Sequence, residues 1–110
     1  MLGPHMHAIG TQIRFEHTPA GGERACLIED PHWDADWQSV YVIEGGVEQH
    51  PSIAPGDVLR LTCTYDNSLN NPSLVEALED YGLDSPITVG MGSAGLDEMC
   101  MFVYGLAFPR

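Results

Sequence analysis

Apolar and polar side chains alternate along much of the first 65 residues, and this alternation predicts β-strands. Over residues 11–17, Ile13 and Phe15 lie on one face and Gln12, Arg14 and Glu16 lie on the other. The turn sequence T-P-A-G-G at 18–22 separates this segment from a second short strand at 24–29. The two segments together predict a β-hairpin.

Further strands are expected at 38–44, which is rich in β-branched and aromatic residues, and at 47–53, where Pro51 indicates a sheet edge or a bend. The turn at 54–57 leads into a clearly alternating strand at 58–65. The last strand, expected over 98–108, is apolar on both faces, as is typical of a central strand.

One segment breaks the strand pattern and predicts a short helix near residues 73–81. Leu74, Ala77, Leu78 and Tyr81 recur at helical spacing, Ser73 is the expected cap and Gly82 the expected end. Many short strands with a single helix in a long loop predict an all-β fold, an antiparallel, jelly-roll-like β-sandwich. The length fits a single domain over residues 1–110.

Charge excludes two classes of partner. The chain has 16 acidic residues, four arginines and no lysine, which gives a net charge of −12. This field repels phosphate backbones and anionic membrane surfaces and attracts cations, including metal ions. We therefore expect no nucleic-acid and no membrane partner. No apolar run reaches transmembrane length, and the chain shows no signal peptide.

Candidate chemistry lies at the two ends of the chain, in His5-Met6-His7 and in Asp97-Glu98-Met99-Cys100. On a strand, an H-x-H triplet places both imidazoles on one face. Adding the Met99 thioether gives two nitrogens and one sulfur, a set that favours copper, above all Cu(I). Structural zinc would normally recruit Cys, a third His or a carboxylate. The alternatives are that the two histidines belong to a solvated N-terminus and that Met99 is a core residue.

Five short motifs occur in a fixed order along the chain: P-H-M-H at 4–7, W-D-A-D-W-Q at 33–38, P-G-D at 55–57, Y-D-N-S at 65–68 and D-E-M-C at 97–100. Together they resemble the C-terminal domain of the copper type II, ascorbate-dependent monooxygenases, a family that includes peptidylglycine alpha-hydroxylating monooxygenase and dopamine beta-monooxygenase. The W-D-x-x-W-Q and Y-D-N-S stretches are most similar to its bacterial branch.

The resemblance implies that His5, His7 and Met99 bind the oxygen-activating copper and that Cys63 pairs with Cys100. It also implies hydroxylation of a substrate C–H bond with O2, with ascorbate as the electron donor, and an extracellular or periplasmic location. Glu98 would then orient a ligand histidine or a substrate, or else be a polar surface residue. Cys26 is left over as the odd thiol, expected to be buried as a small hydrophobe.

Departures from the family pattern narrow the function. The arginine that the peptidylglycine branch carries two residues before the first His is Gly3 here, and a tyrosine four residues after the Met is Val103. Peptide amidation is therefore not expected. The electron-transfer copper of the family is held by another domain, so a stand-alone copper-binding or carrier module without turnover is an alternative. We also expect a domain truncated relative to that of the family, and a homodimer through an unpaired sheet edge or a missing partner domain.

Three remaining histidines, His17, His32 and His50, are interpreted as surface residues. Trp33 and Trp37 are expected to be core anchors. The P-G-D turn within 41–59 also resembles the middle strands of a cupin, a small-molecule-binding barrel. Cupins bring their last histidine after this turn, and no histidine follows Asp57 here.

Overall fold

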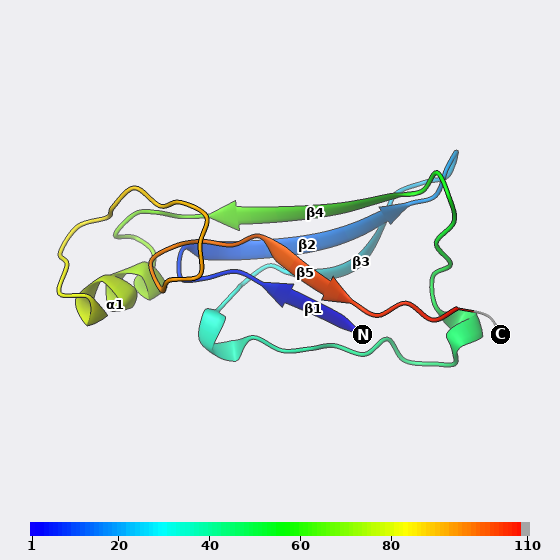
Figure 1. Ribbon diagram of the computed structural model, residues 1–110, viewed down its shortest axis with the longest axis horizontal. Coiled ribbons are helices and arrows are strands. Elements are labelled where there is room, and N and C mark those ends of the chain that lie inside the picture. Colours follow the sequence, from blue (N-terminus) through cyan, green and yellow to red (C-terminus); the bar gives the residue numbers. More distant parts are fainter. Residues whose placement is uncertain (109–110) are drawn as a thin grey trace.

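The structure is a computed structural model that describes residues 1–108. Its strands form two antiparallel sheets, one of three strands in the order β3-β2-β4 and one of two strands, β1-β5 (Figure 1). The strands are β1 (Leu2–His5), β2 (Gly10–Thr18), β3 (Ala25–Asp30), β4 (Val58–Tyr65) and β5 (Met101–Tyr104). The hairpin expected from the turn at 18–22 is confirmed as β2 and β3.

The two sheets pack face to face through the alternating residues of β2. Ile13 and Phe15 are buried on its inner face, at 2% and 5% exposure. The Phe15 ring stacks on Phe102 of β5 with a centroid distance of 4.1 Å, and it also stacks on Tyr104 at 5.7 Å. Aromatic contact between opposed strands is how the two layers of a sandwich share a core. The predicted all-β antiparallel sandwich is confirmed.

The core is divided into two small clusters. Met6, Ile13 and Trp33 form the first between the sheets. The second joins Ile9 to Leu74 and Leu78 of α1 (Pro72–Asp80), the helix at one end of the molecule (Figure 1). No helix of residues 1–108 has the length and apolar character needed to cross a membrane.

The helix begins one residue earlier than the sequence suggested, and a different residue caps it. The Asn71 side chain, rather than that of Ser73, is the N-cap, and it accepts a hydrogen bond from the Ser73 backbone N–H at 3.2 Å. Pro72 follows at the first helical position, where a missing N–H costs nothing. Helices of this length owe their stability mainly to packing, and here Leu74 and Leu78 supply it.

The molecule is elongated, measuring 53 × 25 × 21 Å, with a radius of gyration of 16.7 Å. A compact chain of this length would have a radius of about 13 Å. Many large apolar side chains are consequently exposed, including Val40, Val42, Met101 and Val103. Met101 and Val103 belong to the smaller sheet and alternate with Phe102 and Tyr104, which face the larger sheet, so they lie on its outer side.

Three expected strands differ from the structure. Residues 38–44 contain a single bridge, Leu2 to Tyr41, and otherwise run as an exposed loop after the short 3-10 helix η1 (Ala35–Trp37). Residues 47–53 begin with the 3-10 helix η2 (Val47–Gln49) instead of a strand. β5 is four residues long and, within residues 1–108, pairs only with β1. It is therefore not the long central strand expected over 98–108.

Burial corrects three further predictions. Trp33 is buried as expected, but Trp37 is 81% exposed because η1 lies on the surface. His17 is buried at 5% exposure and pairs with Asp57 across 2.8 Å, so it is not a surface residue. Cys26 is exposed rather than buried, because it lies on β3, a strand at the edge of its sheet.

Candidate metal centre

His5 and His7 lie side by side at the end of β1. Met6 between them is fully buried, so the alternation expected of the H-x-H triplet places the two imidazoles together on the other face. Their ring centroids are 5.0 Å apart and the ring planes are nearly perpendicular, at 83°. Both residues are partly exposed. The two imidazoles are therefore the first two members of the candidate site.

Hydrogen bonds determine which ring nitrogens are free. His5 Nδ1 lies 2.5 Å from the Gln38 side-chain oxygen Oε1, and His7 Nδ1 lies 2.8 Å from the backbone carbonyl of Asp97. A carbonyl oxygen only accepts, so each Nδ1 carries the proton and donates. Each Nε2 therefore keeps its lone pair for a metal.

The backbone brings Met99 to the same place. In the antiparallel ladder Leu2 lies opposite Tyr104 and His5 opposite Met101. The ladder ends at this pair, and the two chain segments continue from it to His7 and to Met99. The Glu98 side chain joins the two residues, since its Oε1 accepts the backbone N–H of His7 at 2.5 Å and that of Met99 at 2.8 Å.

Glu98 contacts the backbones of two candidate ligand residues and neither of the histidine rings. Its side chain is buried at 7% exposure, and its second oxygen, Oε2, has no hydrogen-bond partner in the described part of the chain. From the sequence we expected Glu98 to orient a ligand histidine or a substrate, or else to be a polar surface residue. The contact found is with the main chain of His7 and Met99, which sets the distance between the two segments.

Two motif residues that had no predicted site role hydrogen-bond to the backbone carbonyls of His7 and Met99. Trp33 Nε1 donates to the His7 carbonyl at 3.3 Å, and the Tyr65 hydroxyl donates to the Met99 carbonyl at 3.1 Å. Trp33 and Gln38 belong to the W-D-A-D-W-Q motif, and Tyr65 belongs to the Y-D-N-S motif. Membership of these motifs was the only feature of the sequence that could have indicated a role for them at the site. Burial raises the pKa of Tyr65, and the nearby charge of Glu98 adds to the effect, so its hydroxyl is a donor at neutral pH.

A disulfide joins β4 to the Met99 segment. Cys63 and Cys100 are bonded, with their Cα atoms 5.9 Å apart, which confirms the expected pairing. The bond closes a loop over a sequence separation of 37 residues. Because Cys100 follows Met99 directly, it fixes the position of the methionine relative to the larger sheet.

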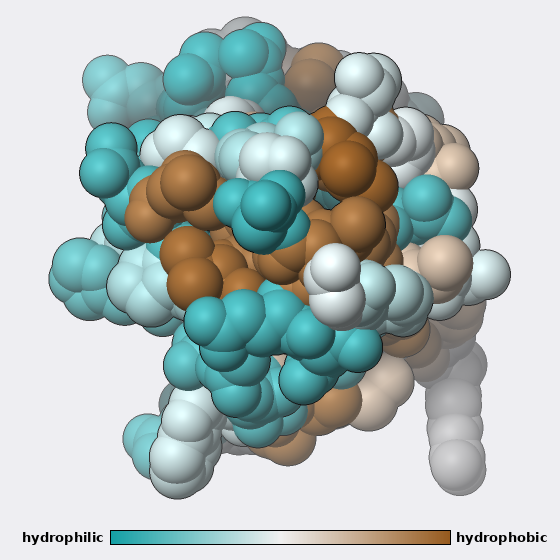
Figure 2. All heavy atoms as spheres, turned by 90° about the vertical axis from the view of Figure 1, so that its left-hand side faces the viewer, coloured by the Kyte–Doolittle hydropathy of each residue, from teal (hydrophilic) through white to brown (hydrophobic). Residues whose placement is uncertain are grey.

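An open pocket of about 260 Å³ lies against Met99. Besides Met99, Glu98 and Cys100, its wall is formed by Ile9, Tyr65, Val89, Gly90 and Met91. Most of this lining is apolar, and Met91 is 90% exposed at its edge. Figure 2 shows apolar side chains gathered within a polar surround at this end of the molecule. Such a surface suits an apolar part of a small molecule.

The donor set fits copper better than zinc or calcium. Nowhere in residues 1–108 do three or more His, Cys, Asp or Glu side chains converge as a metal site would require. His17 is instead paired with Asp57, and His32 is exposed. What the structure does bring together is two free imidazole nitrogens and the Met99 segment, a soft set that suits copper.

The chain over residues 2–105 matches the family model described as copper type II ascorbate-dependent monooxygenase, C-terminal domain. No curated protein and no solved structure matches the chain. The match takes in both histidines, Met99, the disulfide and the motif residues that hold them, and it replaces the cupin interpretation. The chain therefore belongs to the copper type II ascorbate-dependent monooxygenase family, as its C-terminal domain.

Proposed function

We propose that this domain binds one copper ion through His5, His7 and Met99 and serves as the oxygen-activating half of a monooxygenase. The observation that carries the proposal is the pair of Nδ1 hydrogen bonds, which leave both Nε2 atoms free beside the Met99 segment. Family membership supports copper as the metal. Three protein ligands leave a coordination position open for O2.

Copper bound here would supply the one-electron and oxygen chemistry that hydroxylates a substrate C–H bond. The protein positions the reactants. Glu98, Trp33 and Tyr65 hold the ligand backbones through their hydrogen bonds. The pocket beside Met99 would admit the apolar part of a substrate. The bound substrate would then exclude water from the surface that it covers.

Ascorbate is the proposed electron donor, and the small-molecule substrate is one with an apolar group carrying the reactive C–H bond. In the family, electrons arrive through a second copper held by another domain. We therefore propose that this domain turns over only together with such a partner. A disulfide persists in oxidising compartments, which supports an extracellular or periplasmic location.

The ligand assignment is tested by comparing Met99→Ala with Met101→Ala. Met101 is a matched control because it lies opposite His5 in the ladder and is 46% exposed. Cu(I) affinity, measured by anaerobic competition with a chromogenic chelator, should fall at least about tenfold in Met99→Ala, because one of three ligands is lost. It should stay within about twofold in Met101→Ala. Equal affinities in the wild type and Met99→Ala would refute the thioether ligand.

A second experiment separates the monooxygenase from a copper carrier. The copper-loaded protein is incubated with ascorbate and O2, and both O2 consumption and hydroxylated product are measured over a panel of small apolar substrates. Product formed in step with O2 consumption after a soluble electron mediator takes the place of the second copper supports turnover with a partner domain, and product formed without the mediator would contradict the need for that partner. O2 consumption without product, even after a soluble electron mediator is added, favours a copper-binding module.

A further inference from the structure

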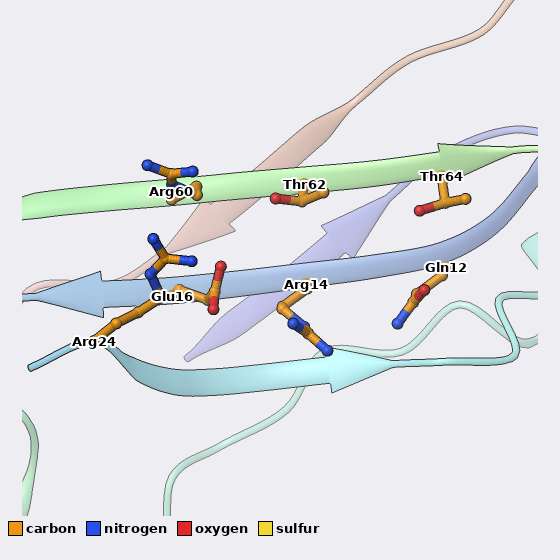
Figure 3. Close-up of a pocket in the computed structure, with 7 residues that line it drawn as sticks. All are labelled: Gln12, Arg14, Glu16, Arg24, Arg60, Thr62 and Thr64. Atoms are coloured by element: carbon orange, nitrogen blue, oxygen red, sulfur yellow. The ribbon is translucent and has the colours of Figure 1, made fainter.

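Three of the four arginines gather on the outer face of the three-stranded sheet, away from the metal centre. Arg14, Arg24 and Arg60 line a groove of about 240 Å³ together with Gln12, Glu16, Thr62 and Thr64 (Figure 3). Arg14 and Glu16 lie on the opposite side of β2 from Ile13 and Phe15, which pack toward β5. The groove is therefore separate from the pocket beside Met99.

Charge is distributed unevenly between this face and the rest of the molecule. The face holds three arginines and two carboxylates, Glu16 and Glu29, for a local charge of +1. The other 14 acidic residues and the remaining arginine carry −13. The groove is therefore the part of the described surface where positive side chains gather against a strongly negative background.

Arg14 is already neutralised. Its guanidinium donates to Glu29 Oε1 at 2.6 Å, and Gln12 donates to the same oxygen at 2.6 Å. The bonds to Glu29 raise the pKa of Arg14, and the bond from Arg14 lowers the pKa of Glu29, as expected of an ion pair. Arg14 lines the groove, but its pairing with Glu29 means that it contributes little net charge there.

Arg24 and Arg60 make no ion pair or side-chain hydrogen bond within the described residues, although acidic residues outnumber basic ones fourfold in the chain. Glu16, the cross-strand partner of Arg60, is 93% buried by its surroundings and likewise has no side-chain hydrogen bond there. Figure 3 shows the Glu16 carboxylate and the guanidinium groups of Arg24 and Arg60 at the same end of the groove.

We propose that this groove binds a small organic monoanion of the carboxylate class. Arg24 and Arg60 would donate to its oxygens, because a guanidinium fork matches the two oxygens of a carboxylate. The Thr62 hydroxyl, which also lines the groove, would be a further donor. Two arginines and one glutamate leave a charge of +1 at this end, which balances a monoanion, whereas the dianion hydrogen phosphate would add uncompensated negative charge to a molecule that already carries −12.

Titration with benzoate, benzamide and inorganic phosphate tests the proposal, with the backbone and Arg Nε–H signals followed by NMR. Benzoate should shift the signals of β2, β4 and Arg24 saturably. Benzamide, its neutral isostere, should not. Shifts of the same size with benzamide, or tighter binding of phosphate than of benzoate, would overturn the assignment.

Charge variants distinguish specific binding in this groove from a general attraction of anions to positive charge. Arg24→Gln and Arg60→Gln should each weaken benzoate binding at least about fivefold, as for a partly exposed ionic contact. Glu76→Gln, on the exposed face of α1 and outside the groove, changes the net charge by the same amount and should bind benzoate like the wild type. Glu16→Gln raises the local charge to +2 and should shift preference toward phosphate. Unchanged benzoate affinity in both single arginine variants would refute the site.

Discussion

Glu98 shows how a single buried carboxylate can connect two segments 91 residues apart in sequence. One of its oxygens accepts the backbone N–H groups of both His7 and Met99. Each ligand backbone would otherwise present an unpaired N–H at a part-buried position. The spacing of the proposed metal ligands His7 and Met99 therefore depends on a residue that is not itself one of them.

Replacing Glu98 with Ala should lower both the stability of the fold and the Cu(I) affinity of the candidate metal centre. Two N–H groups lose their acceptor, which costs about 2 kcal/mol in the free energy of unfolding, measured by urea denaturation. Cu(I) affinity should fall about tenfold, as is usual when a residue behind a metal ligand is removed. Glu98→Gln keeps an acceptor oxygen and should recover most of both losses. Glu76→Ala, on the exposed face of α1, is the control and should change neither quantity. Wild-type copper affinity in Glu98→Ala would contradict this role.

The side chain of Asp57 is only 6% exposed, and its carboxylate makes stability depend on pH. Its side chain accepts the backbone N–H groups of Ala54 and Ala20, each at 2.9 Å, and contacts His17 Nε2 at 2.8 Å. These contacts, with the Ala54 bond the largest, lower the pKa of Asp57 from 3.8 to about 2. A lowered folded-state pKa contributes stability above the unfolded value and loses it as the pH falls through the folded value.

We therefore predict that the free energy of unfolding declines as the pH falls from about 4 to about 2, the interval between the two pKa values of Asp57. Asp57→Asn should be less stable at pH 7 and should have a flatter profile over this interval, as followed by urea denaturation at each pH. Asp84→Asn, in an exposed loop, should keep the wild-type profile. An unchanged slope in Asp57→Asn would show that other groups control acid unfolding.

At the scale of elements, α1 depends on one buried amide. Asn71 caps the helix through its Oδ1, and its Nδ2 donates to the Ala8 carbonyl at 3.3 Å and the Asp66 carbonyl at 2.9 Å. It therefore ties the helix to the turn after β4 and to the segment that follows His7. Because Ala8 directly follows His7, Asn71 also connects the helix to the backbone of the candidate metal centre.

Asn71→Ala should lower the free energy of unfolding by about 2 kcal/mol, because the cap and the two buried carbonyl contacts are lost together. Asn70 is a matched control of the same residue type. It is exposed, and within the described chain its side chain makes no hydrogen bond, so Asn70→Ala should cost less than about 0.5 kcal/mol. Chemical denaturation followed by circular dichroism measures both. Similar losses in the two variants would contradict the role given to Asn71.

Elements whose polarity pattern matched their environment could be predicted from sequence. β2 and β4 alternate because one face packs on the other sheet and one meets solvent. Residues 38–44 have equal β-propensity but lack a partner strand in the described structure, so Val40 and Val42 lie exposed. Propensity alone does not specify pairing, since a strand is stabilised by its neighbours.

The candidate site was predictable to the same limited degree. The H-x-H spacing identified His5 and His7, because alternation depends only on local backbone geometry. Met99 and the disulfide followed from the resemblance. The contact of Gln38 with His5 and the bonds from Glu98 to two backbones could not be predicted, because they join segments whose proximity only the fold determines.

For the molecule as a whole, the Cys63–Cys100 disulfide supplies stability that a divided core does not. A loop closed over a separation of 37 residues is worth about 4 kcal/mol by the chain-entropy relation. Cys63→Ser/Cys100→Ser should lose about that much in chemical denaturation under nonreducing conditions. Reducing the wild type should produce the same loss, while Cys26→Ser should not. A loss below about 1 kcal/mol would mean that packing alone holds the Met99 segment.

The elongated form and its exposed apolar side chains have a further consequence at this scale. Val40, Val42, Met101 and Val103 lie on or beside the smaller sheet, where a second layer could cover them. The homodimer or partner domain expected from the sequence remains a prediction, and this surface is where we would look for it. A contact there would leave the arginine groove free, because the groove lies on the opposite face of β2.

X-ray absorption spectroscopy of the Cu(I)-loaded protein tests the central claim most directly, because it identifies the atoms bound to the metal. The account predicts one sulfur and two imidazole nitrogens around copper, with the sulfur absent in Met99→Ala and retained in Met101→Ala. The histidine contribution should fall in His5→Ala and His7→Ala. A wild-type spectrum without sulfur, or a sulfur that persists in Met99→Ala, would contradict the site of His5, His7 and Met99.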